Sequence, residues 1–204
     1  MNDCLEREFY SLPTVEVARN LIGMKLVRSL VRYGSKMRLA GIIVETEAYG
    51  GPDDGASHAR MGPTSRNSVM FGEVGRAYVY FTYGNHYCVN VSAKSPRQQA
   101  GAVLIRALDP VEGLEVMRER RHPDDLYSIV SGPGKLTRAL GITAAHKGLD
   151  LTDPESELCI ELGTRPKKVV STRRIGISQA IEKSWRFVDP SSRHLSRKVR
   201  IKVL

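Results

Sequence analysis

The sequence predicts an α+β fold, a single mixed domain over residues 1–204 built on a curved antiparallel sheet. A chain of 204 residues has the usual size of one compact domain, and a hydrophobic content of 41% is enough to fill one core. The strand-like runs are joined mainly by turns, which favours hairpins over the helical crossovers of a parallel sheet. The helical patterns gather between these runs, as is typical of α+β domains.

The first half of the chain predicts one short helix, two strands and a long loop. Apolar residues at helical spacing follow Pro13, with Thr14 as the N-cap and Gly23 as the C-terminal stop. Apolar and β-branched runs at residues 24–31 and 39–49 predict strands. Residues 50–75 are rich in glycine, proline and serine, and we expect them to form a surface loop.

A β-hairpin is predicted next. The β-branched and aromatic runs 77–83 and 87–92 flank Gly84 and Asn85, a pair that is typical of a tight turn. The tip of this hairpin is therefore expected to be aromatic. Residues 103–107 predict one more strand.

Two helices and three short strands complete the prediction. Asp109 and Pro110 provide an N-cap and a first-turn proline for a helix over residues 111–121. The segment 131–134, Ser-Gly-Pro-Gly, introduces a second helix at 135–140, which Gly141 closes. Strands are expected near residues 158–162, 169–177 and 185–188.

The composition restricts the class of protein. A formal net charge of +9 and a pI near 9.6 are typical of a protein that binds a polyanion. The three cysteines are far apart and never in a C-x-x-C arrangement, which indicates a reduced compartment with neither a disulfide framework nor a zinc site. No apolar run is long enough to span a bilayer. We therefore expect a soluble, cytoplasmic protein without a metal or other cofactor.

Basic residues are in excess in two zones. Between residues 55 and 108 the only acid is Glu73, against Arg60, Arg66, Arg76, Lys94, Arg97 and Arg106. Near the C-terminus the only acid is Asp189, against Lys183, Arg186, Arg193, Arg197, Lys198, Arg200 and Lys202. The second excess can equally be a solvated tail. Two basic zones on either side of an aromatic hairpin nevertheless favour contacts to phosphates around a side chain that acts on bases.

The leading candidate for a catalytic group is the carboxylate of Glu47, which ends an apolar strand beside Tyr49. A carboxylate can deprotonate a water for hydrolysis at a nucleoside carbon, while aromatic side chains hold the base. Tyr49, His58, Tyr80 and Tyr83 could provide these aromatic faces.

Glu45 competes with Glu47 for the role of base. In an extended strand both side chains point to the same face, so alternation does not choose between them. A glutamate at a strand end can also be a solvated surface residue.

Two polar residues interrupt apolar strands. Arg106 lies within residues 103–108, where burial is costly unless the guanidinium meets a carboxylate or a phosphate. The alternative is an edge position that faces solvent. Asn90 interrupts residues 87–91, and such a residue often only holds a neighbouring loop by a hydrogen bond.

The sequence resembles the alkyladenine (3-methyladenine) DNA glycosylase family at four long motifs in the family's order. These are VETEAYGGPDDGASHA at 44–59, GRAYVYFTYGNHYCVNV at 75–91, VLIRALDPVEGLEVM at 103–117 and SGPGKLTRALGI at 131–142. A supporting match, PTVEVARNLIGMKLV, covers residues 13–27. Beyond residue 142 the match becomes thin, so no residue of the C-terminal third is assigned a site role.

The resemblance implies a bacterial base-excision-repair enzyme. Such an enzyme flips an alkylated or deaminated purine (the class of 3-methyladenine, 7-methylguanine, hypoxanthine and ethenoadenine) out of double-stranded DNA and hydrolyses its glycosidic bond. It would act as a monomer, without a cofactor and without a lyase step. The family's fold, with a hairpin that protrudes from a curved sheet and inserts into DNA, agrees with the fold predicted from the residues.

The resemblance also assigns roles to residues by their place in the motifs. Glu47 would be the general base, held by Arg106. The flipped base would lie between aromatic side chains, namely Tyr49, His58 and Tyr80. Tyr83 would fill the gap that the base leaves, and Asn90 would lie against the edge where guanine carries its 2-amino group.

One position departs from the family pattern. Asn85 stands where family members are expected to have a methionine, which leaves its contact to the opposite strand open.

Two other functions compete with the glycosylase. One is a nucleic-acid-binding module without catalysis, and the other is a hydrolase of free nucleosides.

Overall fold

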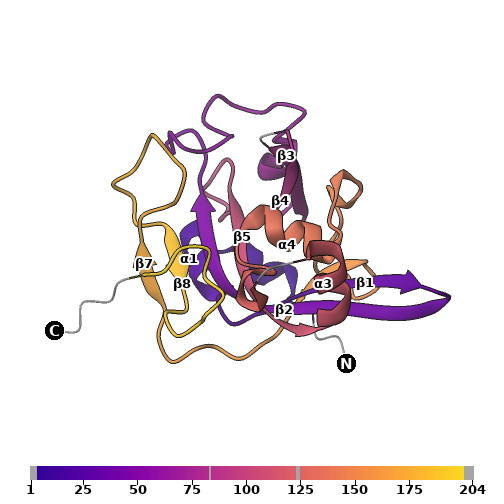
Figure 1. The fold of residues 1–204 in the computed structure, drawn as a ribbon. Helices are drawn as coiled ribbons and strands as arrows, with labels where there is room; N and C mark the ends of the chain where they lie inside the picture. Colours follow the sequence, from indigo (N-terminus) through magenta and orange to yellow (C-terminus); the bar gives the residue numbers. More distant parts are fainter. Residues whose placement is uncertain (1–3, 83, 123–124, 200–204) are drawn as a thin grey trace.

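The computed structural model describes residues 4–82, 84–122 and 125–199 (Figure 1). Its α-helices are α1 (Thr14–Asn20), α2 (Ser68–Phe71), α3 (Leu114–Arg121) and α4 (Pro133–Leu140), and its 3₁₀ turns are η1 (Arg7–Ser11), η2 (Leu126–Ser128) and η3 (Ala144–His146). Its strands are β1 (Lys25–Arg32), β2 (Ser35–Tyr49), β3 (Ala77–Thr82), β4 (His86–Ser92), β5 (Ala102–Glu112), β6 (Leu158–Glu161), β7 (Val170–Thr172) and β8 (Arg186–Val188). Within these ranges, no helix has the length and apolar character needed to cross a membrane.

All strands belong to one antiparallel sheet that branches at β2. Its main order is β3-β4-β5-β2-β1-β6. Strand β5 runs along one edge of β2, while the other edge pairs first with β1, at residues 35–42, and then with β8, at residues 45–47. The long central strand bends as it passes between these partners, and the sheet curls (Figure 1). The predicted α+β class and the curved antiparallel sheet are thereby confirmed.

Two hairpins extend from the sheet. Strand β1 is shifted by one residue from the predicted range, and β2 begins four residues earlier than predicted. The two strands meet at a two-residue turn, where Tyr33 and Gly34 adopt φ values of 51° and 78°. The predicted hairpin of β3 and β4 is confirmed, with Ala77 opposite Val91 and Thr82 opposite His86. Position 83, at its tip, lies outside the described residues.

Helix α1 covers the face of β2 opposite to its carboxylates. Thr46 alternates with Glu45 and Glu47, and its hydroxyl donates a hydrogen bond of 2.7 Å to the carbonyl of Ala18 in α1. The prediction that Thr14 caps this helix was wrong. Thr14 is the first helical residue, and its hydroxyl donates to the carbonyl of Ala93 instead.

The predicted start of the next helix was also wrong. Asp109 and Pro110 belong to β5, where they pair with Ile42 and Gly41 of β2, and α3 begins only at Leu114. Sheet pairing therefore overrides the local signal of a proline in a first helical turn. Strand β4 pairs with β5 only at residues 102–104, so the proline lies beyond the reach of that neighbour, where a missing N–H is tolerated.

The second predicted helix is confirmed as α4, which begins two residues early, at Pro133, and ends at Leu140, with Gly141 as its C-cap at φ of 69°. It packs against α3 and over β4 and β5.

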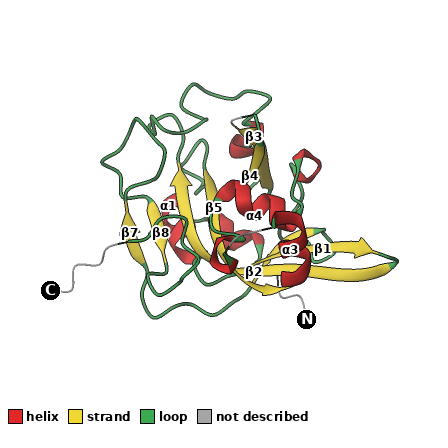
Figure 2. Ribbon diagram, viewed as in Figure 1, coloured by secondary structure: helices red, strands yellow, loops and turns green. Residues whose placement is uncertain are grey.

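The long loop at residues 50–75 is also present, although it contains the single turn of α2 (Figure 2). Of the strand expected at 169–177, only residues 170–172 pair in the sheet, and the remainder forms a loop.

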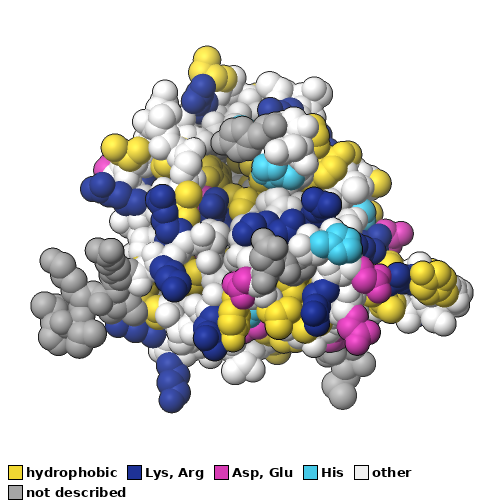
Figure 3. Space-filling model, viewed as in Figure 1, with side chains coloured by type: hydrophobic (Ala, Val, Ile, Leu, Met, Phe, Trp, Pro, Cys, Tyr) yellow, Lys and Arg dark blue, Asp and Glu magenta, His cyan; other side chains and the backbone are white. Residues whose placement is uncertain are grey.

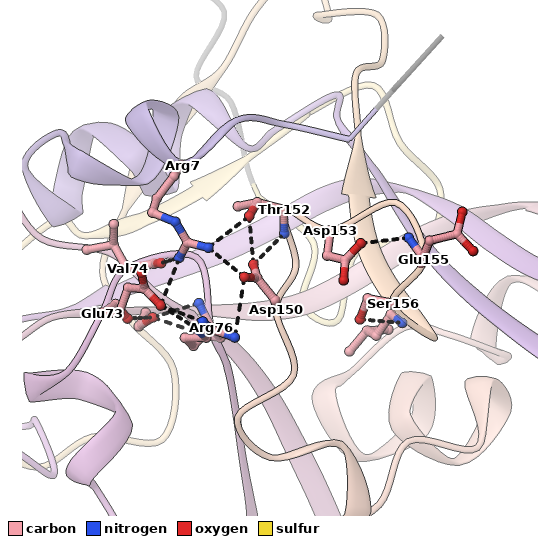
Figure 4. A network of polar contacts seen from close by, with 11 residues as sticks. Arg7, Glu73, Val74, Arg76, Asp150, Thr152, Asp153, Glu155 and Ser156 are labelled. Atoms are coloured by element: carbon pink, nitrogen blue, oxygen red, sulfur yellow. Dashed lines mark hydrogen bonds and ion pairs between the residues drawn. The ribbon is translucent and has the colours of Figure 1, made fainter.

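A network of ion pairs fastens the N-terminal segment to the segment that precedes β3 and to the loop around residue 150 (Figure 4). Arg7 contacts the carboxylate of Asp150 at 2.5 Å and that of Glu73 at 3.3 Å. Arg76 contacts the same two carboxylates. Arg76 is therefore occupied by local partners and does not belong to the free basic zone that the sequence suggested.

Candidate active site

A cavity of about 350 Å³ opens between the β3–β4 hairpin, β5 and two loops. Its wall combines aromatic, apolar and a few polar side chains, as is common in sites for small organic groups. The lining residues are Tyr49, Ala56, His58, Met70, Tyr78, Tyr80, Thr82, His86, Cys88, Asn90, Ala102, Leu104, Arg106, Pro133, Ile175, Gly176 and Ile177. Five of the seven predicted site residues, Tyr49, His58, Tyr80, Asn90 and Arg106, are therefore brought together.

Glu47 lies directly behind this wall. Its side chain is fully buried, and it accepts hydrogen bonds from the hydroxyl of Tyr49 at 2.8 Å, Nη1 of Arg106 at 3.2 Å and the amide of Ile175 at 2.7 Å. All three donors line the cavity, whereas Glu47 is not among its lining residues. The carboxylate is thus held in one orientation by groups that themselves face the cavity.

Burial raises the pKa of Glu47 above its ordinary value, and Arg106, the Ile175 amide and the Tyr49 hydroxyl only partly oppose that shift. A carboxylate with a raised pKa is a stronger base than one in water. Burial also raises the pKa of the Tyr49 hydroxyl, which keeps it protonated as a donor.

Glu45 has a different environment from Glu47. It accepts from Nε of Arg186 at 2.7 Å, from Nε of Arg106 at 3.3 Å, and from the amide and hydroxyl of Ser196 at 2.7 and 2.8 Å. None of these groups except Arg106 lines the cavity. Glu45 therefore holds the C-terminal segment onto the sheet, and the geometry favours Glu47 as the reactive carboxylate.

Arg106 sits at an irregularity in the strand pairing. Ala107 pairs with Glu45 and Ile105 with Thr46, so Arg106 has no partner opposite it on β2. Such a β-bulge redirects a side chain. The guanidinium bridges the carboxylates of Glu45 and Glu47 and is largely buried, which rules out the solvent-facing alternative.

Aromatic rings form one wall of the cavity. The ring of His58 meets that of Tyr80 edge-on, with centroids 4.7 Å apart, and its Nδ1 lies 2.9 Å from the hydroxyl of Tyr78. Burial lowers the pKa of His58, and Arg66 and Arg60 lower it further, so the ring is neutral at neutral pH. Tyr78 was not predicted, although its spacing of two residues from Tyr80 places both rings on one face of β3.

Asn90 lies on β4 between Tyr78 and Leu104, its partners on the two neighbouring strands. Its side chain is buried, lines the cavity and donates a hydrogen bond of 2.9 Å to the carbonyl of Tyr78. Among the described residues, nothing donates to its amide oxygen. Asn90 does not hold a neighbouring loop, which was the alternative to a role in the cavity.

The tip of the β3–β4 hairpin carries the last two residues singled out from the sequence. Tyr83 lies outside the described residues, so its insertion into DNA stays a prediction. Asn85 is exposed, and its side-chain oxygen contacts Nδ1 of His86.

The C-terminal third, to which the sequence assigned no site residue, contributes to the cavity. Ile175, Gly176 and Ile177 line the cavity, and the amide of Ile175 binds Glu47. No motif signalled this segment, because its contribution to Glu47 comes from a backbone amide. Within the described ranges, no cluster of three or more His, Cys, Asp or Glu residues is arranged to bind a metal ion.

Lys and Arg side chains form a band across the face that Figure 3 shows, while Asp and Glu side chains lie mostly below it and to its right. Fewer of the basic residues are free than the sequence suggests. Arg106 and Arg186 are buried against Glu45, and the amino group of Lys94 binds backbone carbonyls. Arg60, Arg66 and Arg97 remain exposed.

Residues 8–193 match the model of a family described as methylpurine-DNA glycosylase. The chain is 44% identical over 193 residues to a protein of Bradyrhizobium diazoefficiens, with 95% of this chain and 90% of that protein covered. It is 46% identical over 202 residues to one of Methanocella arvoryzae (95% and 96% covered) and 47% identical over 193 residues to one of Rhodopseudomonas palustris (95% and 88% covered). Each of these relatives carries the name "Putative 3-methyladenine DNA glycosylase".

Proposed function

Because the chain belongs to the methylpurine-DNA glycosylase family, we propose that it excises alkylated and deaminated purines from double-stranded DNA by hydrolysis of the N-glycosidic bond. The observation that carries this proposal is the buried carboxylate of Glu47, held by three groups that line an aromatic cavity. The cavity, at about 350 Å³, is large enough to hold a flipped base.

In the proposed reaction, the oxygen of a water molecule attacks C1′ of the deoxyribose while Glu47 accepts a proton from that water. The bond between C1′ and the purine nitrogen breaks, and its electron pair leaves with the base. Arg106 holds Glu47 and offsets its negative charge. The raised pKa of Glu47 favours the proton transfer.

The aromatic wall would bind the purine. Tyr49, His58 and Tyr80 would contact its faces, and Asn90 would face the edge where guanine carries its 2-amino group. Tyr83, at the hairpin tip, would occupy the gap left in the duplex. We also propose that the chain is a single glycosylase domain that acts as a monomer.

We propose a single hydrolytic step without strand cleavage. A glycosylase that also cuts the strand generally needs an amine nucleophile, and no lysine is among the described residues that line the cavity. Borohydride treatment during turnover should therefore trap no covalent enzyme–DNA adduct. A trapped adduct would contradict this part of the proposal.

The central experiment measures base release from duplexes that each contain one lesion: 3-methyladenine, 7-methylguanine, hypoxanthine or ethenoadenine. The wild-type protein should release at least one of them. Glu47→Gln should lower the single-turnover rate on the order of a hundredfold or more while binding to the lesion duplex persists. Binding without release by the wild type would favour a module without catalysis, and release from free inosine would favour a nucleoside hydrolase.

A further inference from the structure

A second buried ion pair lies behind the cavity and has no part in the chemistry proposed above. Arg174 and Asp54 form a bidentate pair, with Nη1 to Oδ2 at 2.6 Å and Nη2 to Oδ1 at 2.7 Å. The exposed fractions of the two side chains are 0% and 1%. The planar guanidinium fits the carboxylate with two parallel hydrogen bonds, a geometry that lysine cannot reproduce.

This pair joins the two loops that border the cavity. Asp54 also accepts hydrogen bonds from the amides of Gly50 and Ala56, which fixes the loop that carries Ala56 and His58 into the lining. Arg174 directly precedes residues 175–177, which line the cavity from the other loop. The ion pair therefore sets the position of one loop relative to the other.

Arg174 also touches the groups that hold Glu47. Its guanidinium carbon lies 4.8 Å from the ring centroid of Tyr49, and its Nη1 donates to the carbonyl of Ala48 between Glu47 and Tyr49. The next residue, Ile175, donates its amide to Glu47 at 2.7 Å. Two of the three donors to Glu47 are thus positioned directly by Arg174.

We propose that Asp54 and Arg174 are positioning residues. Through the hydroxyl of Tyr49 and the amide of Ile175, they orient Glu47 to accept a proton from the attacking water. This inference rests on the proposed function. Its physical basis is that a backbone amide in a loop donates to a fixed carboxylate only if the loop is held. The competing role is purely structural, in which the pair stabilises the fold without acting on Glu47.

The two roles differ in their effect on the pH dependence of excision. Loss of either donor leaves the ionised form of Glu47 less stabilised, so its pKa should rise and the acidic limb of the rate profile should move to higher pH. The test measures single-turnover excision against pH, lesion-duplex affinity and thermal unfolding for Asp54→Asn, Arg174→Gln and Arg174→Lys.

The inference predicts that Asp54→Asn and Arg174→Gln lower the rate at neutral pH by about tenfold or more, move the acidic limb upward and change affinity only a few-fold. Arg174→Lys should rescue part of the rate, because it keeps the charge but not the bidentate geometry. An acidic limb at the wild-type position, with only a lower unfolding temperature, would overturn the inference.

Removal of one member of a buried pair can prevent folding. The double variant Asp54→Asn/Arg174→Gln removes both charges and leaves groups that can still hydrogen-bond each other. Circular dichroism then reports the fold. The guanidinium carbon of Arg174 lies 5.2 Å from the ring centroid of Trp185, the one tryptophan of the chain. The fluorescence of Trp185 therefore reports this local contact.

Asp150→Asn provides the matched control. Asp150 also pairs with an arginine far away in the sequence, Arg7 (Figure 4), but no residue of this network lines the cavity. This variant should lower stability without a shift of the acidic limb.

A failure of the proposed function remains distinguishable from a failure of this inference. If the wild-type protein releases no base, the titration of ¹³C-labelled glutamate by NMR still compares the pKa of Glu47 between the wild type and the double variant. An unchanged pKa would then overturn the inference, and a raised pKa would support the coupling of the pair to Glu47.

Discussion

The hydroxyl of Tyr49 donates a hydrogen bond of 2.8 Å to Oε2 of Glu47, two residues away on the same strand. In a strand, residues i and i+2 point to one face, so this contact follows from local geometry. It gives one aromatic residue two functions, since the ring lines the cavity while the hydroxyl holds the carboxylate behind it.

Tyr49→Phe should separate these two functions. The ring remains, so affinity for a lesion duplex should change little. Loss of the hydroxyl removes a donor to ionised Glu47, so the pKa of Glu47 should rise further and the acidic limb of single-turnover excision should move to higher pH. A hydrogen bond to a charged group contributes about 1.5–3 kcal/mol, which corresponds to a shift of about one to two pH units.

The control for this variant is Tyr10→Phe. The hydroxyl of Tyr10 is buried and has no hydrogen-bond partner among the described residues. Its removal should leave the acidic limb unchanged. If the acidic limb of the excision rate lies at the wild-type pH in both variants, Tyr49 does not act on Glu47.

Glu45→Gln should affect stability more than catalysis. The substitution leaves Arg186 without its carboxylate partner and Arg106 with Glu47 alone. Breaking a buried ion pair costs about 3 kcal/mol, or roughly 6–12 °C in unfolding temperature for a domain of this size. The folded fraction should retain excision within about tenfold of the wild type. A loss of activity as large as that of Glu47→Gln would show that the two carboxylates act as a unit.

Asn90→Ala should relax discrimination against guanine. A side chain placed against the guanine 2-amino group can reject it by a clash or an unpaired donor. The variant should excise mismatched guanine faster by about tenfold, or about 1.4 kcal/mol in barrier, while excision of alkylated adenine stays within a few-fold. A parallel decline on both substrates would indicate that Asn90 only supports the hairpin through Tyr78.

Binding to duplex DNA should depend strongly on salt. If about five exposed cations contact phosphates, the slope of log affinity against log salt should be about −4 to −5. Lys135 is exposed at a hollow that shares His86 and Pro133 with the cavity, so Lys135→Gln should reduce the slope by about 1. Lys36→Gln, on the β1–β2 hairpin, serves as the control and should leave the slope unchanged. A slope near zero for the wild type would contradict contact with the DNA backbone.

Local sequence determined the parts of this protein that depend on neighbouring residues. The turn at Gly84 fixes the β3–β4 hairpin, and strand alternation places Glu45 and Glu47 on one face with Thr46 on the other. The same alternation brings Tyr78 and Tyr80 to one wall of the cavity. The family motifs indicated five of the lining residues, which lie in the motifs at 44–59, 75–91 and 103–117.

Only the tertiary structure gives Glu45 and Glu47 the different surroundings on which the proposal of Glu47 as the base rests. The partners that distinguish them, Arg186 and Ser196 for Glu45 and Ile175 for Glu47, lie more than 100 positions away in the sequence, and local periodicity carries no information on such contacts. The bulge at Arg106 and the strand conformation of Pro110 likewise follow from pairing with β2. Burial and hydrogen bonding across the sheet thus overrode local propensity at the places where the site is built.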